Sequence, residues 1–104
     1  MNTQKIYNIG VIGAGWIAKA HMGFLQETGR ANITWIAARN PENLEKVRSE
    51  FEIPNLTHDY RDILKDPAVE VVLIATPPNL HKEMFIEAVK AGKHVLREKP
   101  MALN

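Results

Sequence analysis

The sequence of 104 residues contains no cysteine. Without thiols there is no disulfide framework, no thiolate nucleophile and no thiolate metal site. This composition suits a reducing compartment, so we expect a cytoplasmic protein. The four histidines (His21, His58, His81 and His94) show no metal-ligand spacing, and each lies on a different predicted element. The sequence therefore predicts no metal site.

An excess of charge of one sign and a long apolar run are also missing. Thirteen basic and twelve acidic residues leave a formal net charge of +1, with no basic block. Binding to nucleic acid or to an anionic membrane is therefore not expected. No run reaches the ~18 apolar residues that a membrane-spanning helix needs. The apolar stretch from Ile9 to Ala18 is better explained as a strand entering a glycine turn than as a signal peptide.

What the sequence does contain is a regular alternation of strand-like and helix-like segments. Apolar, β-branched runs predict strands, and apolar residues at helical spacing between glycine and proline breaks predict helices. The helix at 80–91 is expected to bury Met84, Phe85, Ala88 and Val89. The predicted strands are 5–12, 33–37, 56–57 (the weakest), 69–75 and 94–98, and the predicted helices are 16–27, one from Pro41 to before Pro54, a short one capped by Asp59, and 80–91.

This order predicts an α/β fold: a Rossmann-type, doubly wound parallel sheet of five strands in one domain. The almost continuously apolar segment 69–75 is typical of a strand covered on both faces. Ligands of such sheets bind beyond the carboxyl ends of the strands, where the strand order reverses. Unusual residues follow four of the predicted strands there, at Gly13–Gly15, Ala38-Arg39, Thr76-Pro77-Pro78 and Glu98-Lys99-Pro100.

The glycine loop has the pattern G-x-G-x-x-A between the first strand and the first helix. Gly13 permits the tight turn, Gly15 lets a pyrophosphate approach the backbone, and Ala18 lets the helix pack closely on the sheet. The phosphates would meet free N–H groups at the positive end of the helix dipole. The loop predicts dinucleotide binding, with a ligand-free glycine turn and an S-adenosylmethionine site as alternatives.

The end of the second strand carries no acidic residue for the ribose 2′-hydroxyl of NAD. Residues 37–40 read Ala-Ala-Arg-Asn, and the planar guanidinium of Arg39 suits a phosphate instead. This favours NADP over NAD as the cofactor, unless Arg39 is only a solvated loop residue.

Two later loops are less decisive. Thr76 and Asn79 could line the cofactor, or Asn79 could simply cap the next helix. Lys99 would stand at the mouth of the site, where a lysine can exchange a proton with a substrate hydroxyl or only orient the substrate.

Three segments, "VIGAGWIAKAH", "ATPPNLHKE" and "GKHVLREKP", in this order and spacing, resemble the N-terminal domain of the Gfo/Idh/MocA family. The resemblance implies an NAD(P)-dependent oxidoreductase acting on sugars, polyols and related hydroxy compounds. It implies a pyrophosphate held by Gly13, Gly15 and the backbone of Trp16 and Ile17, and a cofactor lined by Thr76, Pro77, Asn79 and His81. By the same resemblance Lys99, beside Glu98, contacts the nicotinamide ribose and takes part in proton transfer.

The resemblance also predicts that residues 1–104 form an incomplete N-terminal dinucleotide-binding domain. A further strand and a C-terminal substrate domain would lie outside this sequence, so we expect the 104-residue chain alone to be inactive. The last strand would then expose an unpaired edge, which predicts a homo-oligomer. A non-catalytic dinucleotide sensor and a methyltransferase-like domain are the alternatives.

Overall fold

The computed structural model describes residues 6–76 and 78–97, without the side chains of residues 16, 78–81 and 97. Strands and helices alternate throughout this part, as predicted. In chain order the elements are β1 (Tyr7–Ile12), α1 (Trp16–Glu27), β2 (Ala31–Ala37), α2 (Pro41–Phe51), β3 (Asn55–Thr57), α3 (Arg61–Lys65), β4 (Val71–Ile74), α4 (Pro78–Lys90) and β5 (His94–Arg97).

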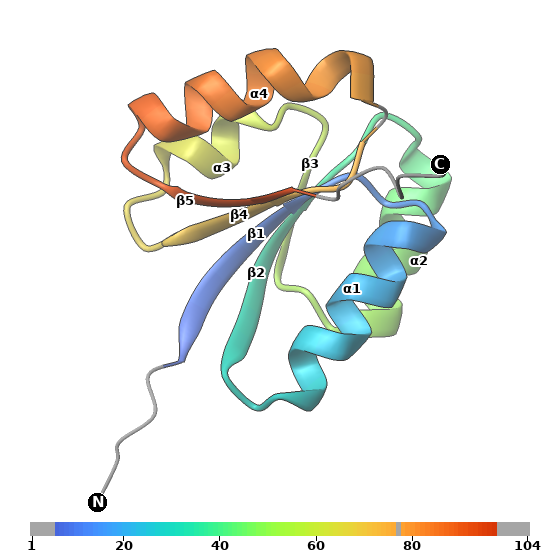
Figure 1. Cartoon of the computed structure of the whole chain (residues 1–104). Helices are drawn as coiled ribbons and strands as arrows, with labels where there is room; N and C mark the ends of the chain where they lie inside the picture. Colours follow the sequence, from blue (N-terminus) through green and yellow to red (C-terminus); the bar gives the residue numbers. More distant parts are fainter. Residues whose placement is uncertain (1–5, 77, 98–104) are drawn as a thin grey trace, which may run out of the picture.

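The five strands form one parallel sheet in the order β3-β2-β1-β4-β5. The chain runs outward from β1 to β3, then returns to β4 on the other side of β1, so the strand order reverses between β1 and β4. Helices α1 and α2 cover one face of the sheet, and α3 and α4 cover the other (Figure 1). The doubly wound sheet of five strands is therefore confirmed.

Two apolar cores hold the layers together. The core beneath α1 and α2 includes Val11, Met22 and Leu44, and the core beneath α3 and α4 includes Ile12, Ile63 and Val72. All four residues of β4 are buried, which explains the continuous apolar run in this segment. Each large apolar side chain buried in this way contributes about 1.5–3 kcal/mol.

Helix α4 differs from its prediction at two places. It begins at Pro78, so Asn79 stands in its first turn and does not cap it. Met84 and Ala88 face the core as predicted and Phe85 is partly buried, but Val89 is 51% exposed. The prediction for Val89 was wrong because α4 packs mainly on β4 and β5 at the edge of the sheet, where the buried face of a helix is narrow.

Helix α3 is held at both ends by side chains. Asp59 Oδ1 accepts a hydrogen bond from the Arg61 N–H at 3.0 Å, although Tyr60 occupies the N-cap position itself. After the helix, Asp66 Oδ2 accepts from Trp35 Nε1 at 2.8 Å. Trp35 thus ties β2 to the turn before β4.

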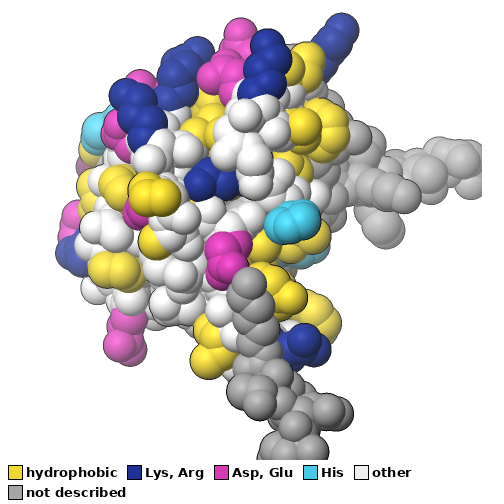
Figure 2. Space-filling model, turned by 90° about the vertical axis from the view of Figure 1, so that its left-hand side faces the viewer, with side chains coloured by type: hydrophobic (Ala, Val, Ile, Leu, Met, Phe, Trp, Pro, Cys, Tyr) yellow, Lys and Arg dark blue, Asp and Glu magenta, His cyan; other side chains and the backbone are white. Residues whose placement is uncertain are grey.

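Figure 2 shows basic, acidic and hydrophobic side chains interspersed on the face that it displays. This distribution agrees with the near-zero net charge of the chain. Within the described residues, no helix is long and apolar enough to cross a bilayer.

Candidate functional site

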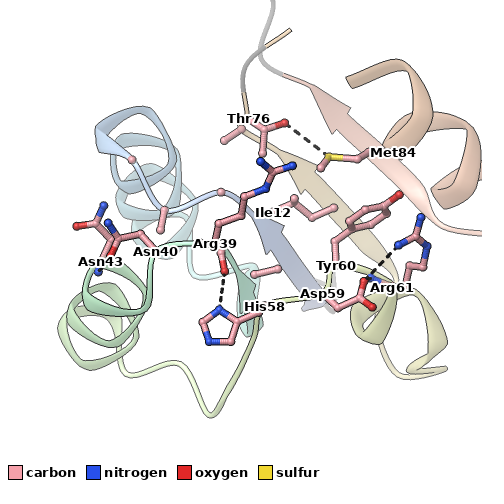
Figure 3. Close-up of a pocket in the computed structure, with 16 residues that line it drawn as sticks. Ile12, Arg39, Asn40, Asn43, His58, Asp59, Tyr60, Arg61, Thr76 and Met84 are labelled. Carbon is pink, nitrogen blue, oxygen red and sulfur yellow. Dashed lines mark hydrogen bonds and ion pairs between the residues drawn. The ribbon is translucent and has the colours of Figure 1, made fainter. Parts of the chain in front are cut away.

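A groove of about 740 Å³ opens at the carboxyl edge of the sheet (Figure 3). It lies where the strand order reverses, at the position predicted for a ligand of a doubly wound sheet. The ends of β1 and β2 and the loops after β1, β2, β3 and β4 surround it. The lining residues are Ile12, Gly13, Ala14, Gly15, Ala37, Ala38, Arg39, Asn40, Asn43, His58, Asp59, Tyr60, Arg61, Ala75, Thr76 and Met84.

Gly13 turns the chain at the end of β1. Its φ angle is +115°, and a Cβ placed on it would lie 2.6 Å from the backbone oxygen of Ala75. Its N–H donates to the carbonyl of Ala37 at 2.6 Å, which closes the turn against β2. Only glycine fits here, because both the backbone angle and the neighbouring strand exclude a side chain.

Gly15 meets a different requirement. Its φ angle of −80° suits any residue, and a Cβ placed on it would meet nothing within 4 Å. Gly15 is the N-cap of α1, and the first turn of α1 has neither a side-chain cap nor an acidic residue. The start of α1 therefore presents its backbone to open space, a feature that suits close approach of an anion.

The third position of the glycine pattern serves packing. Ala18 is fully buried in the core between α1 and the sheet, as its small size predicts. Ile17 is half-buried beside it, while the side chain of Trp16 lies outside the described part of the structure.

Arg39 follows β2 and reaches over the groove (Figure 3). Its guanidinium makes no hydrogen bond or ion pair with any residue that the structure describes. The next residue, Asn40, caps α2 by accepting from the N–H groups of Glu42 and Asn43 at 2.9 and 3.2 Å. The loop is thus anchored by Asn40, while Arg39 is available to a ligand.

Thr76 is the remaining predicted residue that the structure brings into the groove. Its hydroxyl lies 3.6 Å from the sulfur of Met84 in α4. Pro77, Glu98 and Lys99 lie outside the described residues, as do the side chains of Asn79 and His81. Of the residues predicted to hold a cofactor, Gly13, Gly15, Arg39 and Thr76 therefore share one groove.

The loop after β3 also lines the groove, which no motif of the sequence predicted. It contributes His58, Asp59, Tyr60 and Arg61. The available signal was the topology rule itself, because the loop after every parallel strand reaches the same edge of the sheet. The three-residue β3 was the weakest predicted strand, so its loop was read only as a helix cap.

Asp59 places a carboxylate beside the groove, but its Oδ1 already has a partner in Arg61. Oδ1 accepts from the Arg61 N–H at 3.0 Å and lies 3.6 Å from the Arg61 guanidinium. His58 is turned toward the chain, with Nδ1 3.1 Å from the carbonyl of Ala38. Among the described residues, no group of three or more acidic or histidine side chains could hold a metal ion.

The groove can therefore accept a ligand with an anionic centre and a flat apolar part. The anion would meet the open backbone at Gly15, and the apolar part would lie on Ile12, Ala37 and Met84. Such a combination of an apolar slot and a few polar groups is typical of small-molecule sites.

Comparison with known proteins identifies the family of the chain. Residues 7–104 match the model of the Gfo/Idh/MocA family, described as an oxidoreductase family with an NAD-binding Rossmann fold. The chain belongs to this family. The resemblance drawn from the three sequence segments is confirmed.

Relatives in the Gfo/Idh/MocA family include dehydrogenases of sugars and polyols. The levoglucosan dehydrogenase of Pseudarthrobacter phenanthrenivorans is 40% identical over 105 residues, an alignment that covers 91% of this chain and 26% of that protein. A solved levoglucosan dehydrogenase in complex with NADH has a TM-score of 0.83 at 38% identity, covering 94% of this chain and 28% of the other. The apo scyllo-inositol dehydrogenase from Lactobacillus casei has a TM-score of 0.86 at 28% identity, covering 99% and 31%.

The chain thus spans between about a quarter and a third of the length of these relatives. It corresponds to their NAD-binding Rossmann domain.

Proposed function

We propose that this chain is the NAD(P)-binding part of an oxidoreductase that transfers a hydride between a nicotinamide cofactor and a sugar, polyol or related hydroxy compound. The observation that carries the proposal is the open backbone at Gly15, next to a groove at the reversal point of the sheet. Family membership supports the reaction class. The substrate-binding groups would come from a C-terminal domain, so the 104 residues alone would not turn over substrate.

In this proposal the chain's own residues bind and orient the cofactor, which supplies the hydride or accepts it. The backbone of Gly13, Gly15, Trp16 and Ile17 would hold the pyrophosphate at the start of α1. Thr76 would lie along the cofactor, since it lines the same groove. Pro77, Asn79 and His81 are assigned to the same role by family resemblance alone.

Lys99 and Glu98 are proposed only from the resemblance of the "EKP" segment. Lys99 would contact the nicotinamide ribose and move a proton to or from the substrate hydroxyl, with Glu98 beside it. A lysine can do this when its surroundings lower its pKa toward neutrality.

We further propose that NADP is preferred over NAD. The support is Arg39, which reaches over the groove and makes no hydrogen bond or ion pair within the described residues. Asp59 is the acidic residue that lines the groove and could accept from a ribose hydroxyl. Its Oδ1 is already engaged with Arg61. The solved levoglucosan dehydrogenase binds NADH, so the preference proposed here would distinguish this chain from that relative.

Titration with NADPH, NADH and S-adenosylmethionine tests the proposal. We expect both pyridine nucleotides to bind and S-adenosylmethionine not to bind. Arg39→Asp should lower the ratio of NADPH affinity to NADH affinity at least tenfold, about 1.4 kcal/mol, because it replaces a phosphate ligand by a like charge.

Arg30→Asp is the matched control, since Arg30 is an exposed arginine in the turn between α1 and β2. It makes the same change of charge away from the groove and should leave the ratio unchanged. If both variants lowered the ratio of NADPH affinity to NADH affinity equally, Arg39 would not be the phosphate ligand. A cytoplasmic location and a homo-oligomeric state remain predictions of the same proposal.

A further inference from the structure

One sulfur-containing side chain lines the groove. The sequence has no cysteine, so the thioethers of its four methionines are its only sulfur groups. Met22 and Met84 are the two methionines of the described residues. Met22 is fully buried in the core beneath α1 and α2, whereas Met84 in α4 is 9% exposed and lines the groove. The two side chains thus share one chemistry but differ in their access to a small solute.

The sulfur of Met84 lies between the groove and the core. The hydroxyl of Thr76, in the loop after β4, donates to this sulfur at 3.6 Å (Figure 3). Met84 also belongs to the apolar cluster that contains Ile12 and Ile74. Thr76 is assigned to the cofactor in the proposed function, so a change at the sulfur acts directly on a residue of that site.

We propose that Met84 is a peroxide-sensitive modification site, whose oxidation to the sulfoxide weakens binding of the nucleotide. In this step the thioether sulfur attacks one oxygen of hydrogen peroxide, the S–O bond forms and the O–O bond breaks. The sulfur is oxidised by two electrons, and the displaced hydroxide takes the proton of the transferred oxygen and leaves as water. Methionine sulfoxide reductases reverse the change. The effect on binding rests on the proposed function.

The added oxygen changes the wall of the groove. A thioether is apolar and a weak acceptor, whereas a sulfoxide is polar and chiral. The 3.6 Å between the sulfur and the Thr76 hydroxyl leaves no room for another oxygen, which must displace Thr76, project into the groove or enter the core. The first two changes alter the surface that the cofactor meets. The third buries a polar group against apolar side chains.

A nucleotide in the groove should in turn protect Met84. It covers the wall to which Met84 contributes, so bound NADH should slow oxidation there. Met22 is the internal comparison, because peroxide reaches it only when the core opens, and NADH slows such opening only by stabilising the whole fold. Protection of Met84 beyond that of Met22 is not expected of a methionine that is merely buried.

The test treats the 104-residue chain with hydrogen peroxide, with and without NADH, and locates the sulfoxides by peptide mass spectrometry. We expect Met84 to be oxidised faster than Met22, and NADH to slow this reaction. After catalase has removed the peroxide, the dissociation constant of NADH should be about tenfold higher than in untreated protein, as for a polar group placed against apolar surface. Methionine sulfoxide reductase should restore the original value.

Met84→Leu is the control variant, since leucine has a similar volume and no sulfur. Its affinity for NADH, whatever the starting value, should not change on treatment, although Met1, Met22 and Met101 are still present. Met22→Leu should respond to peroxide as the wild type does. If Met84→Leu does not fold, the mass spectrometry and the repair by the reductase in the wild type decide the question.

The outcomes separate this inference from the proposed function. If untreated wild type binds NADH, but Met84 is oxidised no faster than Met22 or becomes a sulfoxide without loss of affinity, the inference is wrong and the proposed function stands. An equal loss of affinity in treated Met84→Leu, or a treated wild type without a melting transition, also contradicts the inference. If untreated wild type does not bind NADH, the proposed function fails and the inference falls with it.

Discussion

Gly13 and Gly15 are separated by a single residue, but the reasons for a glycine at the two positions differ. At Gly13 the φ angle of +115° and the backbone of Ala75 exclude a side chain, so this glycine serves folding. At Gly15 neither the backbone angle nor any neighbouring atom excludes one. The fold therefore does not require a glycine at position 15, which agrees with the proposed approach of a ligand to its backbone.

The difference predicts opposite effects of the same small substitution. Gly13→Ala should destabilise the protein by about 3 kcal/mol or more, since it combines a strained φ angle with a backbone clash. Gly15→Ala should change the free energy of unfolding by less than about 1 kcal/mol, because its conformation is ordinary. Urea denaturation of both variants is the measurement. Equal destabilisation would contradict the distinction drawn between the two glycines.

At the residue scale, the sequence predicted the members of a known pattern but not their neighbours in space. Gly13, Gly15 and Arg39 were predictable because each follows a strongly predicted strand. Tyr60 lines the groove from the loop after the weakly predicted β3, and its hydroxyl donates to Glu87, 27 residues away. No local pattern encodes such a contact.

At the scale of elements, the alternation of strands and helices was predictable because each has its own apolar period. The errors lie where tertiary structure decides. Strand β2 begins at Ala31 instead of Ile33, where it pairs with Tyr7 of β1. Val89 is exposed because α4 lies at the edge of the sheet. The sequence of the helix does not show which strands it will cover, so this exposure could not be predicted.

Asp66 joins elements that are distant in the sequence. Its carboxylate accepts from Trp35 of β2 and from the Ala68 N–H, at 2.8 and 2.9 Å. The hydrogen bond from Trp35 is the main reason that the pKa of Asp66 is lowered, and the Ala68 N–H lowers it further. A carboxyl whose pKa is lower in the folded state stabilises the fold above its unfolded pKa, and this contribution disappears as pH falls through the folded pKa.

Asp66→Asn should therefore cost about 1 kcal/mol at pH 7, because an amide sets a donor against one of the two N–H groups. The difference from the wild type should shrink as pH falls below about 4, where the wild-type carboxyl is protonated as well. Chemical denaturation from pH 7 to pH 3 measures it. Glu27→Gln, at the exposed end of α1, controls for the loss of one negative charge. A constant difference across this range would be inconsistent with the linkage.

At the scale of the whole molecule, the sheet has an asymmetric edge. Within the described residues β5 pairs only with β4, and no strand lies on its other side. Leu96 of β5 is 44% exposed, and Ile86 and Val89 of the neighbouring α4 are exposed as well. An apolar outer strand of this kind favours pairing with another chain.

We expect this edge to drive self-association of the 104-residue chain. Leu96→Lys should weaken association about tenfold or more, because a lysine on an outer strand opposes pairing. Sedimentation velocity over a range of concentrations measures it. Phe24→Lys is the control, since Phe24 is an exposed apolar residue of α1 on the other face of the sheet. A monomer at every concentration in the wild type would argue against this role of β5.

We propose that the open backbone at Gly15 holds the diphosphate of a pyridine nucleotide. The most direct test is the melting temperature of the wild type and of Gly15→Ala with increasing NADH and NADPH. Binding stabilises the native state by about 2.7 kcal/mol when free ligand exceeds its dissociation constant a hundredfold. We predict a rise in the wild type and a much smaller rise in Gly15→Ala, each measured from the melting temperature of that protein without ligand. No rise in the wild type, or an equal rise in both proteins, would contradict the claim.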